Sequence, residues 1–166
     1  NVSCNGLSDG IAMVNPTGGV IWSGGYAYLW NNGSPFPYLN NLSGGIYHVT
    51  ITDDNGCTTS DTAYIAEPDN LILSTIVDNW NSCFGMTNGM ISAYATGGTL
   101  PYQYSIDGIS YQSSNFFMGL SAGIYDITVT DNNNCTESQS NITLVEPTQL
   151  IATIATTDAS CFGDGG

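Results

Sequence analysis

Hydrophobic and polar residues alternate along several short stretches of the chain, and this period of two predicts β-strands. In residues 45–52 (GIYHVTIT), the apolar positions Tyr47, Val49 and Ile51 are separated by polar ones, so one face of the strand is apolar. Residues 123–130 (GIYDITVT) repeat the same alternation. Further strands are expected at residues 11–14, 25–30, 90–95 and 101–106. Because no stretch shows the 3.6-residue period of a helix, the sequence predicts an all-β fold.

These strands belong to a sequence that repeats with a period of about 78 residues. The related positions are Cys4 with Cys83 and Cys161, Gly18-Gly19 with Gly97-Gly98, Leu42 with Leu120, Tyr47 with Tyr125, Asp53 with Asp131, Cys57 with Cys135, Glu67-Pro68 with Glu146-Pro147, and Leu71 with Leu150. The repeat predicts a unit 1 at residues 1–68, which lacks its first strand, a unit 2 at 69–147, and the start of a unit 3 at 148–166. We therefore expect the chain to be a segment of a longer tandem array.

Each unit is expected to fold as a small antiparallel β-sandwich of the immunoglobulin-like kind, because its short strands are separated by frequent turn signals. Asp54, Asn55 and Gly56 predict a hairpin turn after the first of the two quoted strands. Asn134 occupies the position of Gly56 in the second copy, and Asn also tolerates the positive φ that such a turn requires. Trp30 ends an alternating strand and is expected in the core.

The charge of the chain is entirely negative. Its 14 Asp and Glu residues are balanced by no Lys or Arg, which gives a net charge of −14. Nucleic acid is excluded as a partner because nothing can neutralise its phosphates, and an anionic membrane surface is disfavoured for the same reason. The longest apolar run, at residues 71–77, is too short to cross a bilayer, so no membrane insertion of this segment is expected.

No catalytic site is expected. His48, the single histidine, lies on the polar face of its strand, and Asp126 replaces it in the second copy. Without Lys or Arg, the chain also lacks a Schiff-base lysine and a cationic clamp for phosphates or oxyanions. The acidic turns at residues 8–10 and 52–56 offer oxygen ligands for Ca²⁺, but neither matches an EF-hand loop. We therefore expect solvated turns and no cofactor or metal site, with Ca²⁺ as the alternative.

The cysteines allow two pairings that follow the repeat. Pairing within units joins Cys4 to Cys57 and Cys83 to Cys135, and pairing between units joins Cys57 to Cys83 and Cys135 to Cys161. The first is favoured because each small module would then carry its own cross-link. A third possibility is that the cysteines are buried free thiols and form no disulfide. Disulfides would place the chain in an oxidising, extracellular compartment.

Two tryptophans are candidates for ligand contact. Trp22 lies in an insertion that the second unit lacks, and Trp80 has no counterpart near Cys161. Aromatic side chains of this kind could bind surface polysaccharide.

The motifs of each unit resemble the SprB-type repeat of Bacteroidota cell-surface adhesins. They read CNGLSDG (residues 4–10), GG, YAYLW, LSGGIYHVTITDDNGC (residues 42–57) and EP, followed by CFGMTNG, GGTLPYQYSI, LSAGIYDITVTDNNNC and EP. The resemblance implies export by the type IX secretion system and display as an outer-membrane-associated filament that supports attachment or gliding motility. It thus favours a structural stalk whose partners are the neighbouring repeats of the same chain. A carbohydrate-binding array of a secreted protein is the alternative.

Overall fold

The computed structural model describes residues 1–21 and 24–156, and its regular structure is entirely β. The strands are β1 (Gly10–Met13), β2 (Ala27–Trp30), β3 (Tyr38–Leu42), β4 (Gly45–Thr52), β5 (Thr58–Ile65), β6 (Ile72–Asn79), β7 (Gly89–Thr96), β8 (Gln103–Ser105), β9 (Phe116–Leu120), β10 (Gly123–Thr130) and β11 (Thr136–Leu144). Within these residues, no helix is long and apolar enough to span a membrane. The predicted all-β class is confirmed.

Unit 1 is built from two small antiparallel sheets. One contains β1 and β3, and the other has the order β2-β4-β5. Inward-facing side chains from both sheets form one apolar core: Val2, Ala12, Trp30, Leu39, Leu42, Val49, Ile51 and Ile65. Trp30 is only 2% exposed, as predicted, and its indole N–H donates to the Phe36 carbonyl at 2.8 Å.

Unit 2 repeats this arrangement with one strand more. Its sheets have the orders β6-β7-β9 and β11-β10-β8. They enclose a second core: Leu71, Ile91, Ala93, Tyr104, Phe117, Ile127, Val129, Ile142 and Leu144. The strand β7 has neighbours on both edges, whereas its equivalent β1 pairs, within the described residues, with β3.

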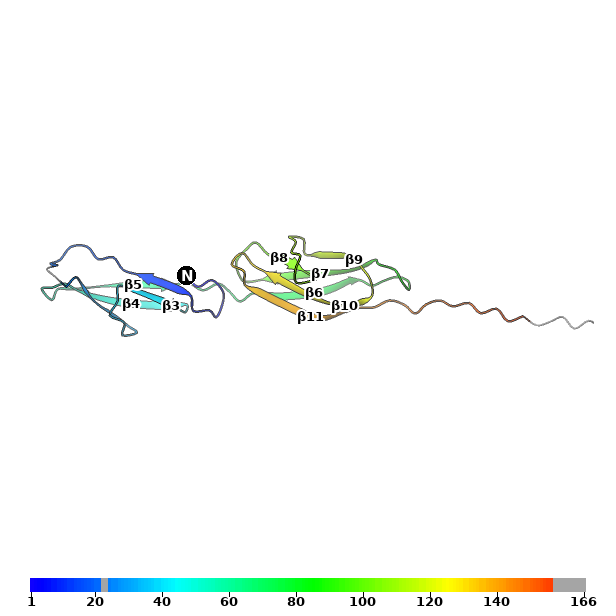
Figure 1. Ribbon diagram of the computed structural model, residues 1–166, viewed down its shortest axis with the longest axis horizontal. Helices are drawn as coiled ribbons and strands as arrows, with labels where there is room; N and C mark the ends of the chain where they lie inside the picture. The colour runs from blue at the N-terminus through cyan, green and yellow to red at the C-terminus, as the bar shows by residue number, and fades with distance from the viewer. Residues whose placement is uncertain (22–23, 157–166) are drawn as a thin grey trace, which may run out of the picture.

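The two cores are separate, and the units lie end to end along the long axis of the molecule (Figure 1). Residues 148–156 continue as an extended tail without strand pairing. The remainder of the predicted third unit, residues 157–166, lies outside the described residues. The molecule is therefore a row of tandem β-sandwiches.

The hairpin turn after β4 and its copy after β10 have the predicted geometry. Gly56 has φ 82° and Asn134, at the equivalent position, has φ 64°. Asn thus takes the left-handed conformation that Gly takes in the first copy, and the turn is preserved.

Candidate functional site: the junction between the two units

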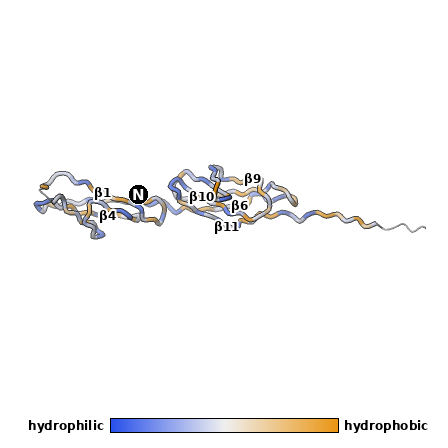
Figure 2. Tube along the Cα trace, in the orientation of Figure 1, coloured by the Kyte–Doolittle hydropathy of each residue, from blue (hydrophilic) through white to orange (hydrophobic). Residues whose placement is uncertain are grey.

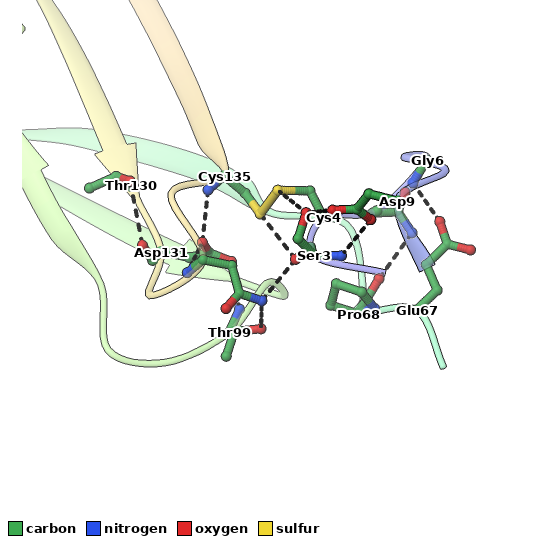
Figure 3. Close-up of a disulfide and its surroundings, with 12 residues drawn as sticks. Ser3, Cys4, Gly6, Asp9, Glu67, Pro68, Thr99, Thr130, Asp131 and Cys135 are labelled. Atoms are coloured by element: carbon green, nitrogen blue, oxygen red, sulfur yellow. Dashed lines mark hydrogen bonds between the residues drawn. A yellow bond between two sulfur atoms is a disulfide. The ribbon is translucent and has the colours of Figure 1, made fainter. Parts of the chain in front are cut away.

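A disulfide joins the two units. It links Cys4, in the N-terminal loop of unit 1, to Cys135, in the β10–β11 hairpin of unit 2, with 5.7 Å between their Cα atoms (Figure 3). The two cysteines are 131 residues apart in the chain. The bond therefore fixes the end of one sandwich against the end of the next.

This pairing corrects the one favoured from the sequence. Neither Cys4–Cys57 nor Cys83–Cys135 forms, and Cys57 and Cys83 are exposed free thiols. The alternative Cys57–Cys83 bond does not form either, and Cys161 lies outside the described residues.

The length of a strand explains why pairing within a unit fails. Asn5, next to Cys4, donates its side-chain amide to the carbonyl of Pro68, just beyond the far end of β5. Cys57 directly precedes β5 at the opposite end of the unit. An eight-residue strand is about 25 Å long, whereas disulfide-bonded Cα atoms lie within about 7 Å of each other. Cys4 therefore lies beside unit 2 and far from Cys57, its predicted partner.

Side-chain hydrogen bonds accompany the cross-link. The Asn133 amide donates to the backbone carbonyl of Ser3 at 2.8 Å and to the Thr99 hydroxyl at 3.2 Å. One amide thus joins the loop that precedes Cys4 to two loops of unit 2.

The segment that connects the units lies directly on the Gly97-Gly98 loop. The Gly98 N–H donates to the Asp69 carbonyl at 2.8 Å, and a Cβ atom at Gly97 would lie 1.9 Å from the Asn70 carbonyl oxygen. Leu71 follows, only 6% exposed, and joins the core of unit 2. The paired glycines therefore provide the close backbone approach that docks the connection.

An aspartate holds this loop in both units. The Asp131 carboxylate accepts the backbone N–H groups of Thr99, Asn133 and Cys135 at 2.8–2.9 Å. Asp53 accepts the equivalent groups of Val20, Asn55 and Cys57 at 2.8–3.0 Å.

These contacts give the repeated aspartate a structural role. Hydrogen bonds from Val20 and Cys57 lower the pKa of Asp53, because they favour its charged form. The sequence predicted that this acidic turn is a solvated loop. It did not indicate that the Asp53 carboxylate accepts hydrogen bonds from backbone N–H groups.

The other repeated motif residues also bind the backbone. The Glu67 carboxylate accepts the N–H of Gly6, and Glu146 accepts that of Gly85. In the loop that precedes β4, the Tyr47 hydroxyl donates to the carbonyl of the residue four positions before it, and Tyr125 does the same before β10. Such a contact resembles the tyrosine corner of immunoglobulin-like sandwiches. The motif therefore specifies how loops are anchored.

The remaining candidates are His48, the acidic turn with Asp9 and the two tryptophans. His48 is exposed, and its Nδ1 lies 2.9 Å from the Thr62 hydroxyl. Asp9, in the other acidic turn, accepts the backbone N–H and the hydroxyl of Ser3, and these bonds lower its pKa. Among the described residues, no three His, Cys, Asp or Glu side chains are grouped so that they could hold a metal ion. Trp80 is 48% exposed, and Trp22 lies outside the described residues.

The chain is similar to a known family of repeats and, more distantly, to a solved structure of several domains. Among solved structures, the three N-terminal domains of the Highly Immunogenic Outer Capsid protein (Hoc) of bacteriophage RB49 are similar at 15% sequence identity and a TM-score of 0.46. The match covers 81% of this chain and 54% of that chain, so the alignment spans about half of the Hoc structure. No curated protein matches the chain. The family model of the SprB repeat matches residues 1–35 and 74–110.

Those two regions lie in the first part of each unit and include Cys4 and Cys83, the paired glycines and the strands β1 and β7. SprB repeats belong to cell-surface proteins, which places this segment in the class of surface adhesin-type repeat regions. The resemblance predicted from the motifs is confirmed: the model of the SprB repeat matches a region in each of the two units.

Proposed function

We propose that this segment is a structural spacer of a long extracellular adhesin filament, in which repeats are joined end to end. The observation that carries the proposal is the disulfide between Cys4 and Cys135, which cross-links two sandwiches with separate cores. A cross-link at this place fixes the relative orientation of the units without merging them. That is the property that a rod of repeats requires.

The charge supports an extended form. With a net charge of −14 and no Lys or Arg, the units repel one another and neighbouring filaments. The motif carboxylates Asp53, Asp131, Glu67 and Glu146 are engaged by backbone N–H groups. These four carboxylates anchor loops, which agrees with a structural, non-enzymatic role.

The biological setting follows from the resemblance to Bacteroidota adhesins. We propose that the filament is exported by the type IX secretion system, is displayed at the outer membrane, and supports attachment or gliding motility. Another part of the same polypeptide would make the contact with the surface.

Small-angle X-ray scattering of the full chain tests the spacer role. A compact domain of this length would have a radius of gyration of about 15 Å. We expect a clearly larger value, with two resolved lobes, for the oxidised chain. Reduction or Cys135→Ser should broaden the distribution of distances between the lobes, whereas Cys83→Ser should leave it unchanged. A single compact particle would contradict the proposal.

Carbohydrate binding is the second candidate, and the exposure of Trp80 favours it. Titration of the chain with a panel of polysaccharides, followed by tryptophan fluorescence, tests this function. A fluorescence shift that is lost in Trp80→Phe would support a binding surface. If no polysaccharide shifts the fluorescence, carbohydrate binding is contradicted and the spacer role is the one that stands.

A further inference from the structure

One sheet of unit 2 presents apolar side chains to the outside of the molecule. In the sheet β6-β7-β9, the strand β7 is paired on both edges, so its outer face is that of a complete sheet. Ile91, Ala93 and Phe117 point inward to the core, whereas the alternate positions point outward. We call the outward apolar side chains the apolar face: Ile72, Ile76, Met90, Tyr94, Phe116 and Met118. All of them except Met90 are exposed.

A serine lies at the centre of this face. Ser92 is opposite Ile76 on β6 and opposite Phe116 on β9. It is fully buried, and its hydroxyl donates to the Asp78 carboxylate near the end of β6. Because the hydroxyl already has its partner, a second surface can cover it without leaving a polar group unpaired.

The opposite sheet of the same unit is polar on its outer face. The hydroxyls of Thr128 and Ser138 lie 2.9 Å apart, and the Asp126 carboxylate accepts the backbone N–H of Asn141. Ile124 is an exposed apolar residue of β10 among these polar neighbours. Figure 2 shows the hydrophobic positions that recur along β6 and β9. Exposed apolar side chains are therefore concentrated on one side of the sandwich.

The charge of the chain identifies what can approach this side. The strands β6, β7 and β9 contain one charged residue, Asp78, whereas β10 and β11 contain Asp126 and Glu137. With a net charge of −14, the chain has no Lys or Arg that could pair with a carboxylate of a second copy. Two copies therefore repel each other least where carboxylates are fewest. At the apolar face the two surfaces are also complementary, because both are apolar.

Unit 1 has the same division between its sheets. The strands β1 and β3 contain no charged residue, and Ile11, Met13 and Tyr38 are exposed on them. Tyr38 stacks on the exposed ring of Phe36, with 6.2 Å between the ring centroids. An uncharged apolar face thus recurs with the period of the repeat.

The size of the face determines how strong such a contact can be. Strands lie about 4.8 Å apart and rise about 3.3 Å per residue, so three strands of up to eight residues present about 400 Å². Two such faces bury about 800 Å² together, whereas a stable interface buries at least about 1,200 Å². Contact through one unit is therefore weak, and contacts of successive units in an array add to one another.

We propose that the apolar face is a lateral contact between two copies of this repeat region, in which the apolar face of one copy packs against that of the other. Repulsion between the remaining carboxylates opposes the contact at low ionic strength and is screened by salt. The inference goes beyond the spacer role. A single chain that is extended in scattering satisfies the spacer role whether or not two chains pair.

Sedimentation equilibrium of the full chain tests the contact. Cys57, Cys83 and Cys161 are replaced by Ser, so that free thiols cannot cross-link two copies, and the Cys4–Cys135 disulfide is retained. We expect a reversible equilibrium between monomer and dimer. The association constant should rise about tenfold between 0.1 M and 1 M NaCl, because the Debye length falls from about 10 Å to about 3 Å. A chain that stays monomeric at every concentration and salt, or an association constant that falls with salt, would overturn the proposal.

Two matched variants locate the contact. Met118→Asp adds a carboxylate to the apolar face at a residue that is 70% exposed, and Ile124→Asp adds one to the opposite sheet at a residue that is 68% exposed. Met118→Asp should lower the association constant at least about tenfold, and Ile124→Asp less than about twofold. Met118→Gln, which adds no charge, should give a smaller decrease than Met118→Asp, and near-ultraviolet circular dichroism confirms that each variant is folded.

Other outcomes would reject the second copy as the occupant. Equal effects of the two aspartates would show that charge alone, and no particular face, governs association. Retention of a strictly monomeric chain on an octyl resin, lost in Met118→Asp and kept in Ile124→Asp, would assign the apolar face to an apolar surface and would also overturn the proposal.

Discussion

The carboxylate of Asp131 accepts a hydrogen bond from the backbone N–H of Thr99 at 2.8 Å, and this bond connects the Gly97-Gly98 loop to the β10–β11 hairpin. The same carboxylate accepts the N–H of Cys135, one end of the disulfide. Asp131 is only 4% exposed. A single side chain thus positions both the loop that receives the connecting segment and the cysteine that cross-links the units.

Replacement of Asp131 by Ala should destabilise unit 2. The change leaves three backbone N–H groups without their acceptor, and loss of hydrogen bonds to a charged group at a buried site costs about 2–3 kcal/mol. Urea unfolding should show this decrease in the free energy of unfolding. Glu137→Ala, at an exposed position of β11, is the matched control and should change it by less than about 0.5 kcal/mol. Equal midpoints for the two variants would contradict the assigned role.

Stability should fall in acid. Hydrogen bonds from the Ser110 and Ile109 N–H groups, together with the Ser105 hydroxyl, hold the pKa of Asp107 well below its usual range, and the pKa of Asp53 is lowered by its own backbone bonds. Because these pKa values are lower in the folded chain, the unfolded chain binds protons first, at a pH near 4. The stabilisation is complete above that pH and is lost as the pH falls towards the folded values.

Thermal unfolding between pH 7 and pH 2 measures this loss. Protonation also reduces the net negative charge, so the informative comparison is between the natural chain and Asp107→Asn. The variant should lose less stability than the natural chain over the acidic range. Parallel curves would show that Asp107 does not contribute.

Peptide mapping without reduction should find the peptide of Cys4 joined to that of Cys135. Trypsin cannot cut a chain without Lys or Arg, so pepsin at acidic pH is the suitable protease. Acidic conditions also suppress thiol exchange. Recovery of a Cys4–Cys57 or a Cys83–Cys135 peptide would support pairing within units and contradict the junction described here.

Gly97→Ala should disturb the junction more than Gly18→Ala. Both glycines have a positive φ, 75° and 83°, so both substitutions incur a similar backbone cost of about 1–2 kcal/mol. Only at Gly97 would the added methyl overlap the Asn70 carbonyl, which forces the connecting segment to move. Hydrogen exchange of the Gly98 N–H, which binds Asp69, should therefore accelerate in Gly97→Ala and remain slow in a Tyr94→Phe control. Equal effects of the two alanines on the melting temperature would contradict this contact.

The strands were predictable because alternation is a local property. The residues of β4 and β10 alternate in sequence as they alternate between core and surface, and the turn at Gly56 or Asn134 follows from backbone preference alone. The cross-link was not predictable in the same way. Its pairing depends on which ends of the sandwiches meet, and that is set by the length of β5 and by the docking of the connecting segment on Gly97.

A signal for the correct pairing was nonetheless present. Cys4 to Cys135 also follows the period, as the first cysteine of one unit and the second of the next. The pairings predicted from the repeat all join cysteines adjacent in sequence, whereas this bond passes over Cys57 and Cys83. The role of Asp53 was missed for a related reason, since its partner Val20 lies 33 residues before it.

The disulfide has a mechanical consequence. Residues 5–134 lie inside the covalent loop that it closes, so a pull applied to the two ends of the segment is carried through the sulfur–sulfur bond past strands β1 to β10. Under tension the strands inside the loop bear little load, whereas β11, which follows Cys135, lies in the path of the force. Reduction would transfer the whole force to the hydrogen-bonded strands, so the oxidising conditions outside a cell determine how far such a tether can stretch.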